Sequence, residues 1–137
     1  MSAVRRTTWR RASLHVLSAL FVAAGVLHFA IADSYVRIVP PWLPAPRALV
    51  YVSGACEVAG GLGLLVPATR RAAALGLVLL LLAVWPANLQ MLLNARAAGA
   101  PPWWQALLLA RLPLQLVLVY WVWWAASRPA PAPPESP

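Results

Sequence analysis

Six strongly polar side chains stand inside otherwise apolar stretches of this sequence. They are His28, Glu57, Asn88, Gln90, Arg111 and Gln115. A charged or amide group in an apolar environment costs several kcal/mol unless it is partnered, so each of these groups predicts a polar partner or a ligand. Together they could hold a polar head group or relay a proton.

The residues around these groups indicate that the bilayer is the solvent of this protein. The chain has 137 residues, of which 62% are hydrophobic and 10% are charged. A soluble domain of this size could not bury so much apolar surface. One crossing takes about 20 apolar residues, so four crossings with short links use nearly the whole chain. We therefore predict an all-α fold, a four-helix antiparallel transmembrane bundle.

Four segments have the length and apolarity of spanning helices, at about residues 13–32, 48–66, 72–93 and 103–126. Residues 1–12 form a basic start, and four prolines favour an extended loop over residues 33–47. The tail, residues 127–137, is too rich in proline to pack and is expected to be disordered. The first segment also fits a cleaved signal peptide, which is the alternative for that stretch.

The arginines predict the orientation. All 11 basic residues are arginines, and seven of them fall on the amino-terminal side against three on the other, Arg37, Arg47 and Arg96. Positive residues favour the cytoplasmic side, so both termini are expected there, in a bacterial inner (plasma) membrane. Arginines gathered at helix ends meet lipid head groups, and no nucleic-acid partner is expected.

Four of the polar groups are expected at similar depth on four different helices. At about 1.5 Å per residue, Glu57 lies roughly 15 Å below the outer end of its helix. Asn88 and Arg111 lie roughly 12 Å below their outer ends, and His28 roughly 6 Å below its own. We predict that Glu57 and Arg111 form a buried ion pair. That pair could be a ligand or proton site, or it could only fix helix register.

Prolines lie beside two of these groups, Pro113 between Arg111 and Gln115, and Pro86 before Asn88. A proline inside a helix removes one backbone donor and leaves a carbonyl to be satisfied. Such a carbonyl is usually met by a neighbouring side chain or water, and the alternative is that the kinks open a cavity.

His28 is followed by a polar stretch, Asp33, Tyr35 and Arg37, which we expect to form a lid over the site. The imidazole could bond a quinone carbonyl, relay a proton or make an ordinary hydrogen bond between helices. His15 lies 13 residues away near the opposite face, and neither histidine has further ligands nearby, so no metal or haem site is expected.

The second predicted span is rich in small residues. Ala55, Ala59 and Gly63 are spaced by four, and further glycines surround Glu57, so neighbouring helices should pack most closely here. The single cysteine, Cys56, excludes a disulfide or a paired-thiol redox site within the chain and is expected to be a packing residue.

The first half of the chain resembles the DoxX-like family of small bacterial membrane proteins. The likeness covers about residues 25–91 and rests on HF at His28, YVRIVPP from Tyr35, the glycine-rich run around Glu57, and PAN ending at Asn88. It implies similarity to a membrane subunit of a thiosulfate-oxidising, quinone-linked complex and, more distantly, to an animal membrane-protein assembly chaperone. Ala32 stands where the family has a proline, and Gln90 where a histidine is common. A redox site that needed that histidine would be incomplete.

These observations lead to an accessory membrane subunit with a buried polar site of His28, Glu57, Asn88, Arg111 and Gln115 that binds a quinone or a lipid-like molecule. The alternatives are a quinone-linked oxidoreductase subunit and an assembly factor for another membrane protein. The chain has no catalytic motif or cofactor ligands of its own, so redox chemistry would need a partner subunit. Besides lipid, its expected partners are a second copy or another membrane protein.

Overall fold

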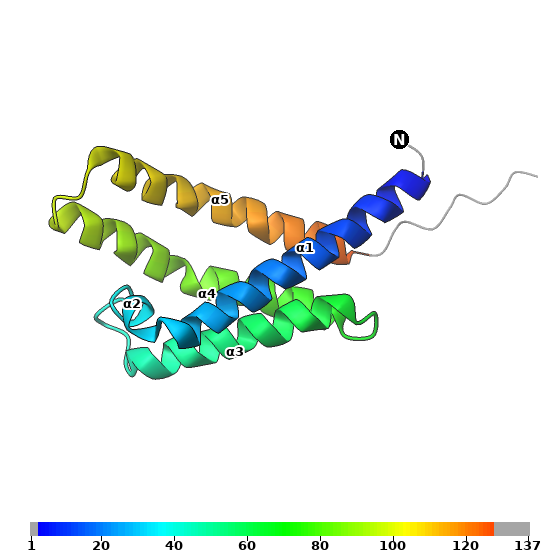
Figure 1. Ribbon diagram of the computed structural model, residues 1–137, viewed down its shortest axis with the longest axis horizontal. Coiled ribbons are helices and arrows are strands. Elements are labelled where there is room, and N and C mark those ends of the chain that lie inside the picture. Colours follow the sequence, from blue (N-terminus) through cyan, green and yellow to red (C-terminus); the bar gives the residue numbers. More distant parts are fainter. Residues whose placement is uncertain (1–2, 128–137) are drawn as a thin grey trace, which may run out of the picture.

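A computed structural model describes residues 3–127 and shows a chain built from helices (Figure 1). The helices are α1 (Ala3–Ala30), α2 (Ala32–Val36), α3 (Pro46–Leu65), α4 (Arg70–Ala97) and α5 (Pro102–Ala126). No strand occurs within that range, so the all-α prediction is confirmed there. Four helices, all but α2, are long and apolar enough to cross a membrane, as expected of a multi-pass membrane protein.

The helix ends differ most from the predicted ones in three places, one of which is the end of α4 at Ala97 instead of about residue 93. The first helix begins at Ala3, so most of the basic start is helical. The predicted loop begins with the short helix α2, because its prolines start only at Pro40 and leave residues 32–36 free to turn. Except for Ser127, the tail predicted to be disordered lies outside the described residues.

The long helices form two pairs that come together at one end and diverge at the other. Helix α1 packs mainly on α3 and α4 on α5, while contacts between α3 and α4 join the pairs. Figure 1 shows the pairs converging where α1 begins and α5 ends, which we call the terminal end. They diverge at the loop end, which holds α2 and the links at residues 37–45 and 98–101.

The apolar core lies at the terminal end. Its most deeply buried members are Leu17, Leu64 and Val122, from α1, α3 and α5, each with no exposed surface. Arg10 ties α1 to the end of α5, because its Nη1 donates to the Ser127 carbonyl at 2.8 Å. Its guanidinium also lies 5.2 Å from the centre of the Trp124 ring, a distance typical of a cation–π contact.

Glycines set the close approach of α1 and α3. A Cβ added to Gly25 would lie 2.6 Å from the Gly54 carbonyl oxygen, and one added to Gly54 would lie 2.6 Å from the His28 Cβ. Ala55 and Ala59, two members of the predicted packing stripe, are instead exposed. The glycines of α3 therefore pack against helices of the same chain, as Gly25 and His28 of α1 show at Gly54.

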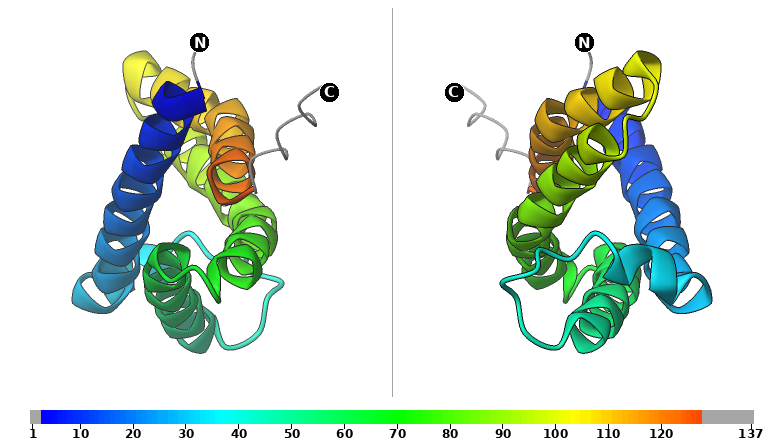
Figure 2. Two further views of the ribbon diagram at one scale, coloured as in Figure 1. Left: turned by 90° about the vertical axis from the view of Figure 1, so that its right-hand side faces the viewer. Right: turned by 90° about the vertical axis from the view of Figure 1, so that its left-hand side faces the viewer.

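Seen along its long axis, the molecule is a wedge with α1 on one side, α4 and α5 on the other, and α3 at the base (Figure 2). The link at residues 37–45 leaves α2, turns towards α4 and returns to α3. Asn94 of α4 holds this link, because its Nδ2 donates to the Arg37 carbonyl at 3.0 Å. The link therefore spans the space between the two helix pairs at the loop end.

Candidate functional site

A cavity of about 730 Å³ lies at the loop end between the two helix pairs. Cavities of about 300–1,000 Å³ are the usual size of small-molecule sites. All five residues of the predicted polar cluster line it: His28, Glu57, Asn88, Arg111 and Gln115. Four helices thus bring these groups to one space, but the prediction that all of them are buried is wrong. His28, Glu57 and Gln115 are buried, whereas Asn88 is half-buried and Arg111 is exposed.

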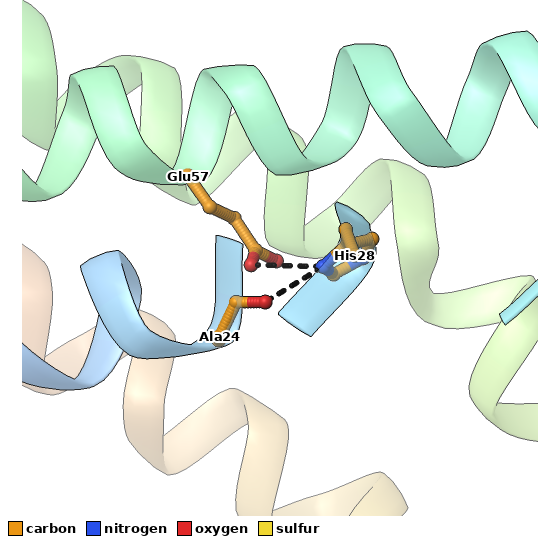
Figure 3. Close-up of polar contacts among 3 residues, drawn as sticks. All are labelled: Ala24, His28 and Glu57. Carbon is orange, nitrogen blue, oxygen red and sulfur yellow. Dashed lines mark hydrogen bonds and ion pairs between the residues drawn. The ribbon is translucent and has the colours of Figure 1, made fainter. Parts of the chain in front are cut away.

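His28 and Glu57 form a buried pair on the α1–α3 side of the cavity (Figure 3). The His28 Nδ1 lies 3.5 Å from the Glu57 Oε2 and 2.9 Å from the Ala24 carbonyl oxygen. Each side chain is 10% exposed, and Glu57 Oε2 accepts no hydrogen bond. The contact with Glu57 is an ion pair only when the imidazole is protonated.

The predicted ion pair between Glu57 and Arg111 is wrong. Within residues 3–127 the ion pairs are His28 with Glu57 and Arg47 with Asp33. Gly54, one turn before Glu57, lets α1 approach so closely that His28 becomes the partner of the carboxylate. Arg111 belongs to the other helix pair and bonds to α4 instead.

Arg111 begins a chain of hydrogen bonds between α5 and α4. Its Nη2 donates to Asn88 Oδ1 at 3.2 Å, and its Nη1 lies 3.6 Å from the Met91 sulfur. Asn88 Nδ2 then donates to Gln115 Oε1 at 2.6 Å, and Gln115 Nε2 donates to the Leu81 carbonyl. Every amide in this chain donates in the same direction, away from the guanidinium.

Side chains meet carbonyls near both prolines. Pro86 frees the carbonyl of residue 82, and Gln115 bonds to the adjacent carbonyl of Leu81. Near Pro113, the Trp85 Nε1 donates to the Leu112 carbonyl at 3.4 Å. The carbonyls that the prolines free are those of Leu82 and Leu109, whereas the two side chains bond other carbonyls, so the interpretation of the prolines as kinks met by side chains stays a prediction. Pro86 lines the cavity.

Tyr35 is the one residue of the predicted lid that lines the cavity. Its ring stacks on His28, with 4.0 Å between the ring centres and 25° between the planes. Burial raises the pKa of the Tyr35 hydroxyl above its ordinary value; the charge of Glu57 adds to the rise and that of Arg111 opposes it. Tyr35 therefore keeps its proton at neutral pH and can donate a hydrogen bond.

The other two predicted lid residues lie at the surface. Asp33 accepts a hydrogen bond from Arg47 at 2.6 Å, and both side chains are more than half exposed. The Arg37 side chain is exposed, and only its carbonyl contacts α4. The walls on this side are instead apolar residues of the link, none of them among the predicted site residues: Ile38, Val39, Pro40 and Leu43. Apolar residues among prolines were the signal that could have indicated them.

The cavity opens sideways between α1 and α5. Leu20 of α1 and Leu114 and Val117 of α5 line it, yet they are 52%, 62% and 59% exposed. The two helices meet at the terminal end, where Arg10 reaches Ser127, and they diverge from there (Figure 1). The side of the cavity between α1 and α5 therefore has exposed apolar residues at its edges.

Of the other polar residues singled out in the sequence, Gln90, His15 and Cys56 lie away from the cavity. Gln90 donates to Asn94 on its own helix at 2.8 Å, and neither residue lines the space. His15 and Cys56 are exposed on the outside of the single chain. Between residues 3 and 127, no three acidic, histidine or cysteine side chains come close enough together to hold a metal ion.

Comparison with known proteins gives one family. The family described as "Domain of unknown function (DUF8561)" matches residues 17–126, from within α1 to the end of α5. No curated protein and no solved structure matches the chain.

Proposed function

We propose that this chain, a member of that family of unknown function, is an accessory membrane subunit that binds a quinone or a lipid-like molecule. The observation that supports the proposal is the cavity at the loop end, which combines polar groups with mostly apolar walls and has exposed apolar residues of α1 and α5 at its side. Spanning helices without a ligand would be expected to close such a space by packing.

The apolar and polar parts of the cavity wall suit the alkyl chain and the head group of an amphiphile. Leucine, valine and proline side chains supply most of the surface and fit a ring or an alkyl chain. Tyr35 and Arg111 supply donors for a carbonyl, hydroxyl or acidic head group. A molecule dissolved in the bilayer could enter between α1 and α5 without crossing water.

The proposed location is a bacterial inner membrane, with both termini in the cytoplasm and the loop end outside. The arginine distribution supports this orientation through the positive-inside rule. The cavity would then lie in the outer half of the bilayer. The resemblance to the DoxX-like family supports a quinone as one candidate ligand.

Filling the cavity tests the binding proposal. Ala87 of α4 lines the cavity, and Ala87→Trp places a large ring inside it. Native mass spectrometry of the full chain from mild detergent should show co-purified amphiphile on the unaltered chain and at least severalfold less on the variant. The matched control is Ala59→Trp, at an exposed position of α3 outside the cavity, which should leave occupancy unchanged. Equal occupancy of the two variants, or an empty unaltered chain, would contradict the proposal.

A quinone-linked oxidoreductase subunit is the second candidate, favoured by the proton-carrying groups beside the cavity. Reduction of a quinone to a quinol consumes electrons and protons in equal number. His28, Glu57 and Tyr35 could supply the protons, and the electrons would come from an electron-carrying partner subunit.

Replacing the imidazole tests this second candidate. In a complex purified with its partner, His28→Gln should lower quinone turnover by about 10²-fold or more if the imidazole transfers a proton. Quinone occupancy, measured on the same sample, should change much less. Turnover that falls only in proportion to occupancy would indicate binding alone.

A further inference from the structure

Arg111 carries a positive charge that no acidic group of the described chain neutralises by direct contact. It lies within α5, the fourth apolar span, and its guanidinium contacts are Asn88 Oδ1 and the Met91 sulfur. Both partners are neutral. A guanidinium offers five N–H donors in a planar fork, so most of these donors remain available to another partner.

The other charged groups of the cavity do not supply that partner. Glu57 is the carboxylate that lines the same space, but His28 is its ion-pair partner. Within residues 3–127 the Glu57 carboxylate makes no ion pair with Arg111, so it does not neutralise the guanidinium by direct contact. Tyr35 lies near both and keeps its proton.

An uncompensated cation inside an apolar span is costly, and such groups normally face a partner or a water-filled space. Here the guanidinium faces a cavity whose side opening is lined by exposed leucine and valine side chains. The arrangement combines a forked donor for an anion with apolar walls that continue to the hydrocarbon. This combination matches a molecule with an acidic head and an alkyl chain.

We propose that the cavity binds an acidic amphiphile, with its carboxylate or phosphate on Arg111 and its alkyl chain leaving between α1 and α5. This inference rests on the proposed function and narrows it from quinones and lipids in general to anionic lipids. A guanidinium binds two oxygens of one carboxylate or phosphate in parallel, which a neutral quinone carbonyl cannot match. Asn88 holds the guanidinium in place and is therefore a positioning residue.

The test compares acids with neutral molecules of the same chain length on the full-length protein in mild detergent. The probes are palmitate and its methyl ester, a lysophosphatidic acid with the same acyl chain, and a short-chain ubiquinone. Affinity is measured by native mass spectrometry and by the rise in unfolding temperature with ligand concentration. The unaltered chain should bind at least one acid about tenfold or more tightly than the ester, since hydrogen bonds to charged groups are the stronger ones.

Three variants test whether Arg111 causes the preference for the acid. Arg111→Gln should bring the acid down to the affinity of the ester, whereas Arg111→Lys should keep part of the preference, because it retains the charge but not the fork. Arg96→Gln removes an arginine that lies at the loop end but outside the cavity, and it should leave the affinities for acid and ester unchanged. If Arg111→Gln does not fold, the inference is still tested by the ratio of acid affinity to ester affinity, measured for the unaltered chain and for Arg111→Lys.

Each outcome has a distinct meaning. Preference for palmitate indicates a free fatty acid, and preference for the phosphate indicates an anionic phospholipid; both support the inference. Equal binding of acid and ester, or binding of the quinone alone, overturns it while the proposed function stands. If none of the four probes binds, the proposed function fails as well.

Discussion

Replacing Gly25 by alanine is expected to lower the stability of the folded chain by about 3 kcal/mol, the upper part of the range for overpacked sites. The added Cβ would lie 2.6 Å from the Gly54 carbonyl oxygen and 2.9 Å from the Val58 backbone nitrogen. These are backbone atoms of α3, so they can move only if the whole helix moves. The α1–α3 contact would have to widen, and His28 would be drawn away from Glu57.

Thermal unfolding in detergent measures this effect, and Gly76→Ala is its matched control. Gly76 lies within α4, and a Cβ added there meets no atom within 4 Å. The control should therefore be neutral or stabilising by up to about 1 kcal/mol, which is the cost of glycine in a helix relative to alanine. Equal unfolding temperatures for the two variants would show that Gly25 does not set the distance between α1 and α3.

Removing one member of the His28–Glu57 pair is expected to cost more than removing both. His28→Leu leaves the Glu57 carboxylate in the cavity wall without its ion-pair partner, and breaking a buried pair in this way costs about 3–5 kcal/mol. The double variant His28→Leu/Glu57→Leu removes both polar groups and should recover most of that loss. Replacing a buried pair by apolar residues of similar volume is often neutral.

A double-mutant cycle measures the coupling, and the Asp33–Arg47 pair gives the comparison. Those two side chains are more than half exposed, so solvent screening should make their coupling small despite the 2.6 Å contact. The buried pair should show the larger coupling. Additive effects of His28→Leu and Glu57→Leu would mean that the two groups are solvated separately and do not act as a pair.

The spans could be predicted from the sequence because length and apolarity are local properties. Each of the four predicted segments lies largely within one long helix. The helix ends were less predictable. The basic start contains no residue that stops a helix, so α1 extends back to Ala3, and α2 fits into the residues between the first span and Pro40.

The membership of the polar site could be predicted, but its pairing could not. Counting residues along straight helices places Glu57 and Arg111 at similar depth, and both do line one cavity. Their partners depend on distances between helices. Because α1 and α3 approach closely at Gly54, Glu57 contacts His28. Because the two helix pairs diverge, Arg111 contacts Asn88 of its own pair. Such distances arise from packing across the whole bundle and are not encoded in the spacing within one segment.

Because the apolar core lies at the terminal end, most residues that stabilise the fold differ from those that would select a ligand. Leu17, Leu64 and Val122 hold the helices together far from the space that faces Tyr35 and Arg111. Phe21 and Leu81 belong both to the core and to the cavity wall, but the link residues Ile38, Val39 and Leu43 line the cavity without belonging to the core, so these can change at small cost in folding free energy. Relatives with this architecture could therefore take up different amphiphiles through substitutions at the loop end alone, while the terminal end stays constant.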